Sequence, residues 1–301
     1  MKLKKKLTII LLFASIFCVA QKKAEKLFDK AYDYSWKYQY RNNDTTKLFP
    51  PYYDSAIYFL KILNTKYPNY RTDRVDEIFQ DSYFGNGEYF KSIEYSLKIL
   101  SRYKNDYIKP EDISVESIFA CKKIAESFLK IGEFKKSILY YDSCSTKYKG
   151  NFLQCGIGVM IDNAYSDKDL FFAHLGLKET KKAIEIATPY FFDSTMTEFI
   201  DSNYSKQYFT AIGEMYSDNQ AKNEIKIAVE SLKIKIEELY KFKNESVLTN
   251  NKVNLFGAYL LLIGDFPKEL MLEVFKENDL KEIVGNKITK SVGYKFYYPE
   301  K

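Results

Sequence analysis

Phe128-Leu-Lys-Ile-Gly132-Glu133-Phe134 is one of three similar stretches in this chain of 301 residues. The others are Tyr83-Phe-Gly-Asn-Gly87-Glu88-Tyr89 and Leu260-Leu-Leu-Ile-Gly264-Asp265-Phe266. In each stretch a glycine ends an apolar helical pattern, because it adopts the left-handed conformation without steric cost. The acid that follows lies at the positive N-terminus of a second helix, and the aromatic residue fills the corner between the helices. Each copy therefore predicts a helical hairpin.

The pattern extends outward from the glycine over both predicted helices. Before Gly132 the predicted helix contains Ile124, Ala125 and Phe128. After it, at offsets of two, five, nine and twelve, come Phe134, Ser137, Tyr141 and Cys144. Around Gly87 the same spacing gives Phe79, Gln80, Tyr83, Tyr89, Ser92, Ser96 and Ile99. An earlier unit has an insertion, Arg41–Pro51, in place of its turn, and its first helix is expected over residues 22–40.

These spacings resemble the tetratricopeptide repeat, in which small residues let paired helices approach and large ones fill the groove between them. The resemblance covers residues 22–150 and implies an all-α fold, with antiparallel helical hairpins stacked as an α-solenoid. The chain departs from the family in two respects. Ser92 and Ser137 are 45 residues apart, against a family period of about 34. The position that usually holds tryptophan is Asp76 in one unit and Cys121 in the next.

We divide the chain into three parts: a signal peptide over residues 1–20, hairpin repeats over 21–150, and a divergent helical domain over 151–301. In the divergent domain only the turn at Gly264 resembles the repeat. Thr188-Pro189 predicts a helix boundary, because the residue before a proline leaves the helical conformation. The β-branched and aromatic residues over Lys287–Tyr298 indicate a short strand near the C-terminus.

The first twenty residues are typical of a secretory signal. A lysine cluster precedes the apolar run Leu7–Phe17, and small residues at Cys18 and Ala20 form a cleavage pattern before Gln21. The sequence therefore predicts an exported protein, periplasmic or secreted in a bacterium, with no transmembrane segment after the signal is removed. The alternatives are an uncleaved membrane anchor and a lipid attached to Cys18, although Phe17 is a poor residue before a lipidated cysteine.

The charge of the chain follows from this N-terminus. Lysine and arginine number 46 against 40 acidic residues, for a net charge of +6. Four of the lysines lie within the first six residues, so the mature chain is close to neutral. A near-neutral exported chain argues against a nucleic-acid partner.

The cysteines outside the signal number three, and they lie close to one another in the sequence. In the resemblance, Cys121 near the start of one helix lies beside Cys144 near the end of its partner, and Cys155 begins the next helix. The two readings are buried apolar side chains or one disulfide between Cys144 and either neighbour. No Cys-x-x-Cys motif or histidine pair is present, so the sequence predicts no metal site.

The residues needed for catalysis are missing, so the sequence predicts neither an enzyme nor a cofactor. The single histidine, His174, lies in an apolar helical stretch, where a structural role is expected. Gly156-x-Gly158 lacks the strand and the lysine of a phosphate-binding loop. The carboxylates Asp73, Asp76 and Glu77 are expected to lie on a solvated helix face and not to act as general acids or bases.

The resemblance implies a binding module whose concave face holds a partner protein or peptide. The residues expected there are Arg74, Glu77, Asp81, Phe84, Phe119, Lys122, Glu126 and Leu129. Their mixed charges predict a polar, salt-sensitive contact. The alternative is a cell-envelope glycan-binding protein that uses exposed tyrosines, of which the chain has 27.

Overall fold

The computed structural model describes residues 19–35, 52–103, 114–148, 156–241, 252–261 and 277–299. These residues are helical apart from loops and one two-stranded sheet, so the fold is all-α, as the sequence predicts. The chain divides into two compact units, Met1–Phe152 and Leu153–Lys301.

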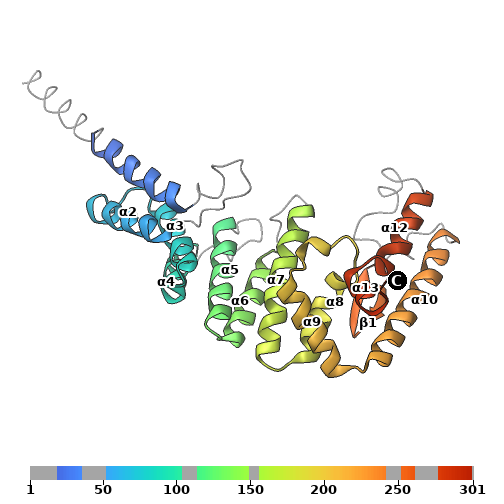
Figure 1. Ribbon diagram of the computed structural model, residues 1–301. Helices are drawn as coiled ribbons and strands as arrows, with labels where there is room; N and C mark the ends of the chain where they lie inside the picture. The colour runs from blue at the N-terminus through green and yellow to red at the C-terminus, as the bar shows by residue number, and fades with distance from the viewer. Residues whose placement is uncertain are drawn as a thin grey trace, which may run out of the picture. The chain divides into compact units, whose positions relative to one another are not determined.

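The N-terminal unit is built from adjacent antiparallel helices (Figure 1). Its helices are residues 19–35, α2 (Tyr53–Lys66), α3 (Thr72–Gly85), α4 (Tyr89–Arg102), α5 (Val115–Lys130) and α6 (Phe134–Tyr148). Helix α3 pairs with α4 and α5 pairs with α6, while α4 also packs against α5. Of the predicted first helix, over 22–40, residues 36–40 lie outside the described ranges.

The two predicted glycine turns have the same backbone geometry. Gly87 and Gly132 have φ angles of +77° and +80°. The amide of Glu88 donates to the carbonyl oxygen of Tyr83 at 2.8 Å, and that of Glu133 donates to Phe128 at 2.9 Å. These hydrogen bonds close the last turn of α3 and of α5 in the manner of a Schellman motif.

A third turn of this geometry joins α7 (Gly156–Gly176) to α8 (Thr180–Phe191) in the C-terminal unit. Lys178 takes the place of glycine with a φ of +62°, and the Glu179 amide donates to the His174 carbonyl oxygen at 2.9 Å. The residue five positions after the turn is small and fully buried in all three hairpins: Ser92, Ser137 and Ala183. The glycine pattern did not predict this hairpin, because its turn holds a lysine.

Replacing Lys178 by glycine is expected to stabilise the C-terminal unit by about 1 kcal/mol, because a residue with a Cβ is strained at positive φ. Replacing it by alanine removes the side chain beyond Cβ and keeps the strain, so no comparable gain is expected. Urea unfolding of both variants followed by circular dichroism separates these results. Equal stabilities for the glycine and alanine variants would show that the turn is not strained.

The seams between paired helices are lined by buried serines as well as apolar residues. Ser92 Oγ donates to the carbonyl oxygen of Gln80 at 2.9 Å, which ties α4 to α3. The hydroxyls of Ser82, Ser127 and Ser137 are buried and have no hydrogen-bond partner among the described residues. Small side chains let the helices approach, but a hydroxyl without a partner costs free energy when it leaves water.

The C-terminal unit surrounds an aromatic core. After α7 and α8 come a 3₁₀ turn (Thr197–Phe199), α9 (Ser202–Met215), α10 (Asp218–Lys241), β1 (Lys252–Leu255), β2 (Ala258–Leu261), α12 (Glu277–Thr289) and α13 (Val292–Tyr297). Phe191 stacks on Tyr208 with ring centroids 4.0 Å apart, and both side chains are fully buried. Strand β2 packs against α8, and α10 packs against β1 and α12.

The helix predicted before the third glycine turn, at Gly264, is wrong. Residues 258–261 form β2, which pairs with β1 in an antiparallel hairpin and is not part of a helix. Phe256 and Gly257 at its turn both have positive φ, as a tight hairpin turn requires. Gly264 lies outside the described residues.

Two further predictions about the C-terminal half are also wrong. Lys287–Tyr298 forms the end of α12 and α13, because the packing of Tyr297 and Ile288 into the core outweighs the local β preference. Helix α8 continues past Thr188-Pro189 to Phe191. Thr188 Oγ1 donates to the Ile184 carbonyl oxygen at 2.7 Å, and the Phe192 amide closes the last turn on the Thr188 carbonyl oxygen at 3.0 Å.

Candidate partner-binding face

A charged cluster joins α3 to α5 on the N-terminal unit. Lys123 Nζ lies 3.7 Å from Asp81 Oδ1 on α3 and 2.9 Å from Glu126 Oε2 on its own helix. The same ammonium group lies 4.2 Å from the centroid of the Phe84 ring. A single lysine therefore holds two carboxylates and one aromatic ring, and it connects two successive hairpins.

Burial and neighbouring charge act against each other in this cluster. Burial raises the pKa of Asp81, and Lys123 reduces that rise. Burial on its own would lower the pKa of Lys123, but Glu126 and Asp81 outweigh it, so the pKa is raised. Lys123 is therefore charged at neutral pH.

A second group of carboxylates extends the face toward the start of both helices. Burial raises the pKa of Glu77, and Arg74 reduces that rise through a contact of 2.7 Å. Glu116 on α5 and Asp73 on α3 raise the Glu77 pKa further. Carboxylates thus outnumber cations among the groups that interact here, so the face has a negative potential.

Most of the residues predicted for the concave face lie on α3 and α5 with partial exposure: Arg74, Glu77, Asp81, Phe84, Phe119, Glu126 and Leu129. Phe119 is the most open of the large apolar ones, with 54% of its surface exposed. Lys122 differs, because it is only 8% exposed. Lys123, one position further along, was not among the predicted residues. Adjacent helix positions point about 100° apart, so Lys122 and Lys123 lie on different faces of α5. Lys123 could have been found from the spacing of three and four residues that places it on one helix face with Glu116, Phe119 and Glu126.

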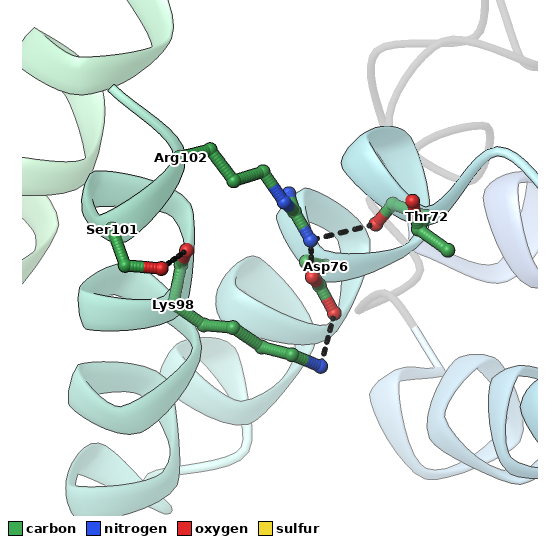
Figure 2. Close-up of polar contacts among 5 residues, drawn as sticks. All are labelled: Thr72, Asp76, Lys98, Ser101 and Arg102. Carbon is green, nitrogen blue, oxygen red and sulfur yellow. Dashed lines mark hydrogen bonds and ion pairs between the residues drawn. The ribbon is translucent and has the colours of Figure 1, made fainter. Parts of the chain in front are cut away.

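Asp76 corrects the prediction of a solvated carboxylate face. Its side chain is only 4% exposed and lies between α3 and α4, where Lys98 Nζ approaches at 3.1 Å (Figure 2). Arg102 also pairs with Asp76 and donates to the carbonyl oxygen of Thr72 at 3.3 Å. Asp76 is therefore a structural residue that fastens α4 to α3.

Cys121 and Cys144 lie in one hairpin, as the resemblance implies, and both are buried. Cys144 Sγ lies 3.9 Å from the carbonyl oxygen of Ile118, one helical turn before Cys121. Cys155 lies outside the described residues, so the disulfide stays a prediction.

His174 has a structural setting at the end of α7. Its Nδ1 atom lies 2.6 Å from Glu179 Oε2, across the turn into α8. Within the described ranges no group of three or more His, Cys, Asp or Glu side chains is placed to hold a metal ion. No described helix is both long and apolar enough to cross a membrane.

Asp167 lies in the C-terminal unit at the offset from its turn that Asp76 has from Gly87. Tyr190 donates to Asp167 Oδ2 at 2.5 Å, and burial raises the pKa of Asp167 more than this hydrogen bond lowers it. Unfolded aspartate loses its proton near pH 3.9. Between this pH and the raised native pKa, the native state retains a proton that the unfolded state has released. The protonated carboxyl group therefore stabilises the native state fully below about pH 3.9, and this contribution is lost as pH rises through the native pKa.

Replacing Asp167 by asparagine keeps an acceptor for Tyr190 and removes the titration. We expect the wild type to gain stability relative to this variant when pH falls from about 7 to about 4. Urea unfolding of both proteins at the two pH values measures the change. A difference in stability that does not vary with pH would contradict the raised pKa.

No protein-family model, no curated protein and no solved structure matches this chain.

Proposed function

We propose that this chain is an exported, non-catalytic interaction module of the cell envelope, which binds a partner protein through the α3–α5 face. We define this face by Glu77, Asp81, Phe84, Phe119, Lys123 and Glu126. The partner segment is basic, because carboxylates outnumber cations on the face. Export rests on the predicted signal at residues 1–20.

The observation that carries the proposal is the exposed Phe119 beside the Asp81–Lys123–Glu126 cluster. Aromatic side chains are enriched in the cores of protein interfaces, and a few such anchors contribute most of the binding energy. Charged groups around it fix the register of the partner and accelerate its association. Complex formation of this kind weakens as salt concentration rises.

The alternative, glycan binding through exposed tyrosines, receives less support from the described residues. Tyr83, Tyr204 and Tyr208 are buried and pack against other rings. The large exposed tyrosines are Tyr52, Tyr58, Tyr165 and Tyr259. Tyr165 and Tyr259 lie on α7 and β2 of the C-terminal unit, whereas Tyr52 and Tyr58 lie at α2 of the other unit, where ring contacts link them through Tyr34 and Phe59.

A photo-cross-linking amino acid at position 119, introduced in living cells, tests the proposal. A matched control carries the same group at Phe90 on α4, which is 74% exposed and lies outside the face. We expect one protein to be captured from position 119 and not from position 90. Mass spectrometry then identifies it.

The same experiment is repeated with Asp81→Ala and Glu126→Ala in the cross-linking chain. Capture from position 119 should fall about tenfold, because each substitution removes a charge that the basic partner needs. Unchanged capture would rule out this face. Saturable binding of the protein to cell-wall polysaccharide that is lost when the exposed tyrosines Tyr52, Tyr58, Tyr165 or Tyr259 are replaced would favour the glycan-binding alternative.

A further inference from the structure

A shallow groove of about 540 Å³ lies between α9 and α13 on the C-terminal unit. It is lined by Ser202, Ser205, Lys206, Phe209, Thr210 and Phe296. These residues belong to two helices of one unit, so the groove is independent of the α3–α5 face.

One wall of the groove is a pair of stacked aromatic rings. Phe209 and Phe296 are nearly parallel, with an angle of 9° between the rings and centroids 3.7 Å apart. Phe296 is 56% exposed, although burying a phenylalanine side chain is favourable by about 1.5–3 kcal/mol. The wall therefore offers a flat apolar surface to a ligand.

The other wall is polar and consists of Ser202, Ser205, Lys206 and Thr210. The side chains of Ser202, Ser205 and Lys206 form no hydrogen bond or ion pair with the described residues. Thr210 Oγ1 donates to the Lys206 carbonyl oxygen at 2.8 Å and keeps its acceptor capacity. The N-cap carboxylate Asp201 is paired with Lys168, so it does not neutralise Lys206 through an ion pair.

We propose that this groove binds an acidic saccharide. A sugar ring has an apolar C–H face that can lie flat against Phe296, as apolar groups do on aromatic rings. Its hydroxyls donate and accept hydrogen bonds, which matches Ser202 and Ser205. A carboxylate on the sugar pairs with the Lys206 ammonium group.

Other ligand classes use only part of this groove. A purely apolar ligand would desolvate the serines and Lys206 without replacing their hydrogen bonds to water. An inorganic anion would leave the aromatic wall exposed. An acidic sugar satisfies both walls at once.

Isothermal titration of the full chain with trigalacturonic acid tests the proposal, and the methyl ester of the same trisaccharide is the uncharged control. We expect the ester to bind about tenfold more weakly, because it keeps the shape and loses the pairing with Lys206. Lys206→Met should cause a similar loss for the acid. Lys181→Met, which removes an exposed lysine of α8 outside the groove, should cause none.

The aromatic wall is tested separately with Phe296→Leu, which keeps an apolar side chain and removes the flat ring. Affinity should fall about tenfold while the circular dichroism spectrum stays the same. Three outcomes would overturn the proposal: no heat of binding up to about 10 mM, equal affinity for the acid and its ester, or tighter binding of a short acidic peptide. None of them bears on the α3–α5 face, so failure here is distinguishable from failure of the proposed function.

Discussion

Asp76→Ala is expected to lower the free energy of unfolding of the N-terminal unit by about 2–3 kcal/mol. The substitution removes the buried carboxylate that pairs with both Lys98 and Arg102. The loss falls below the range for a fully buried ion pair, because the side chains of Lys98 and Arg102 are 54% and 30% exposed and can regain water. Urea unfolding gives the magnitude, and hydrogen exchange of α3 and α4 peptides assigns it to this unit.

Asp73→Ala is the matched control, because Asp73 is an exposed aspartate in the first turn of the same helix. It should cost at most about 1 kcal/mol, through loss of a charge near the helix N-terminus. Equal losses for the two variants would mean that the contacts of Asp76 with α4 contribute no more than a surface charge does.

Gly293→Ala is expected to destabilise the C-terminal unit by about 2 kcal/mol. A Cβ at Gly293 in α13 would lie 2.6 Å from two ring atoms of Phe192. Phe192 is 1% exposed and belongs to the main core, so its ring cannot move away without disturbing other packed side chains. Urea unfolding followed by circular dichroism measures the effect.

Gly213→Ala makes the same chemical change in α9, where a Cβ would meet no heavy atom within 4 Å. Alanine is the better helix former by about 1 kcal/mol, so this variant should be more stable than the wild type. The two substitutions are therefore expected to have opposite signs. Two effects of the same sign would contradict the close packing at Gly293.

The sequence was sufficient to predict the hairpins whose turns hold glycine, because Gly87 and Gly132 signal positive φ directly. It was insufficient at Lys178, where the backbone has the same conformation but the residue type does not indicate it. It also failed at Ala258–Leu261, since a short apolar run suits a helix or a strand equally well and only its pairing with β1 decides.

Seven of the eight residues predicted for the partner-binding face have exposed surface on α3 and α5, and their role in binding stays a prediction. The offsets from the turn placed Phe119 and Glu126 on α5, but they selected Lys122 where Lys123 makes the contacts with Asp81. The burial of Asp76 had an available signal, because Lys98 and Arg102 lie four residues apart on the neighbouring helix and can face the same point.

The three buried serines without hydrogen-bond partners bear on how this chain can change over generations. At Ser82, Ser127 and Ser137 the change from serine to alanine removes a buried hydroxyl that has no hydrogen-bond partner among the described residues. Each position is thus a place where stability can be added without altering the packing of the helices. A chain with such reserves can accept costly substitutions on its exposed faces and recover the loss inside its seams.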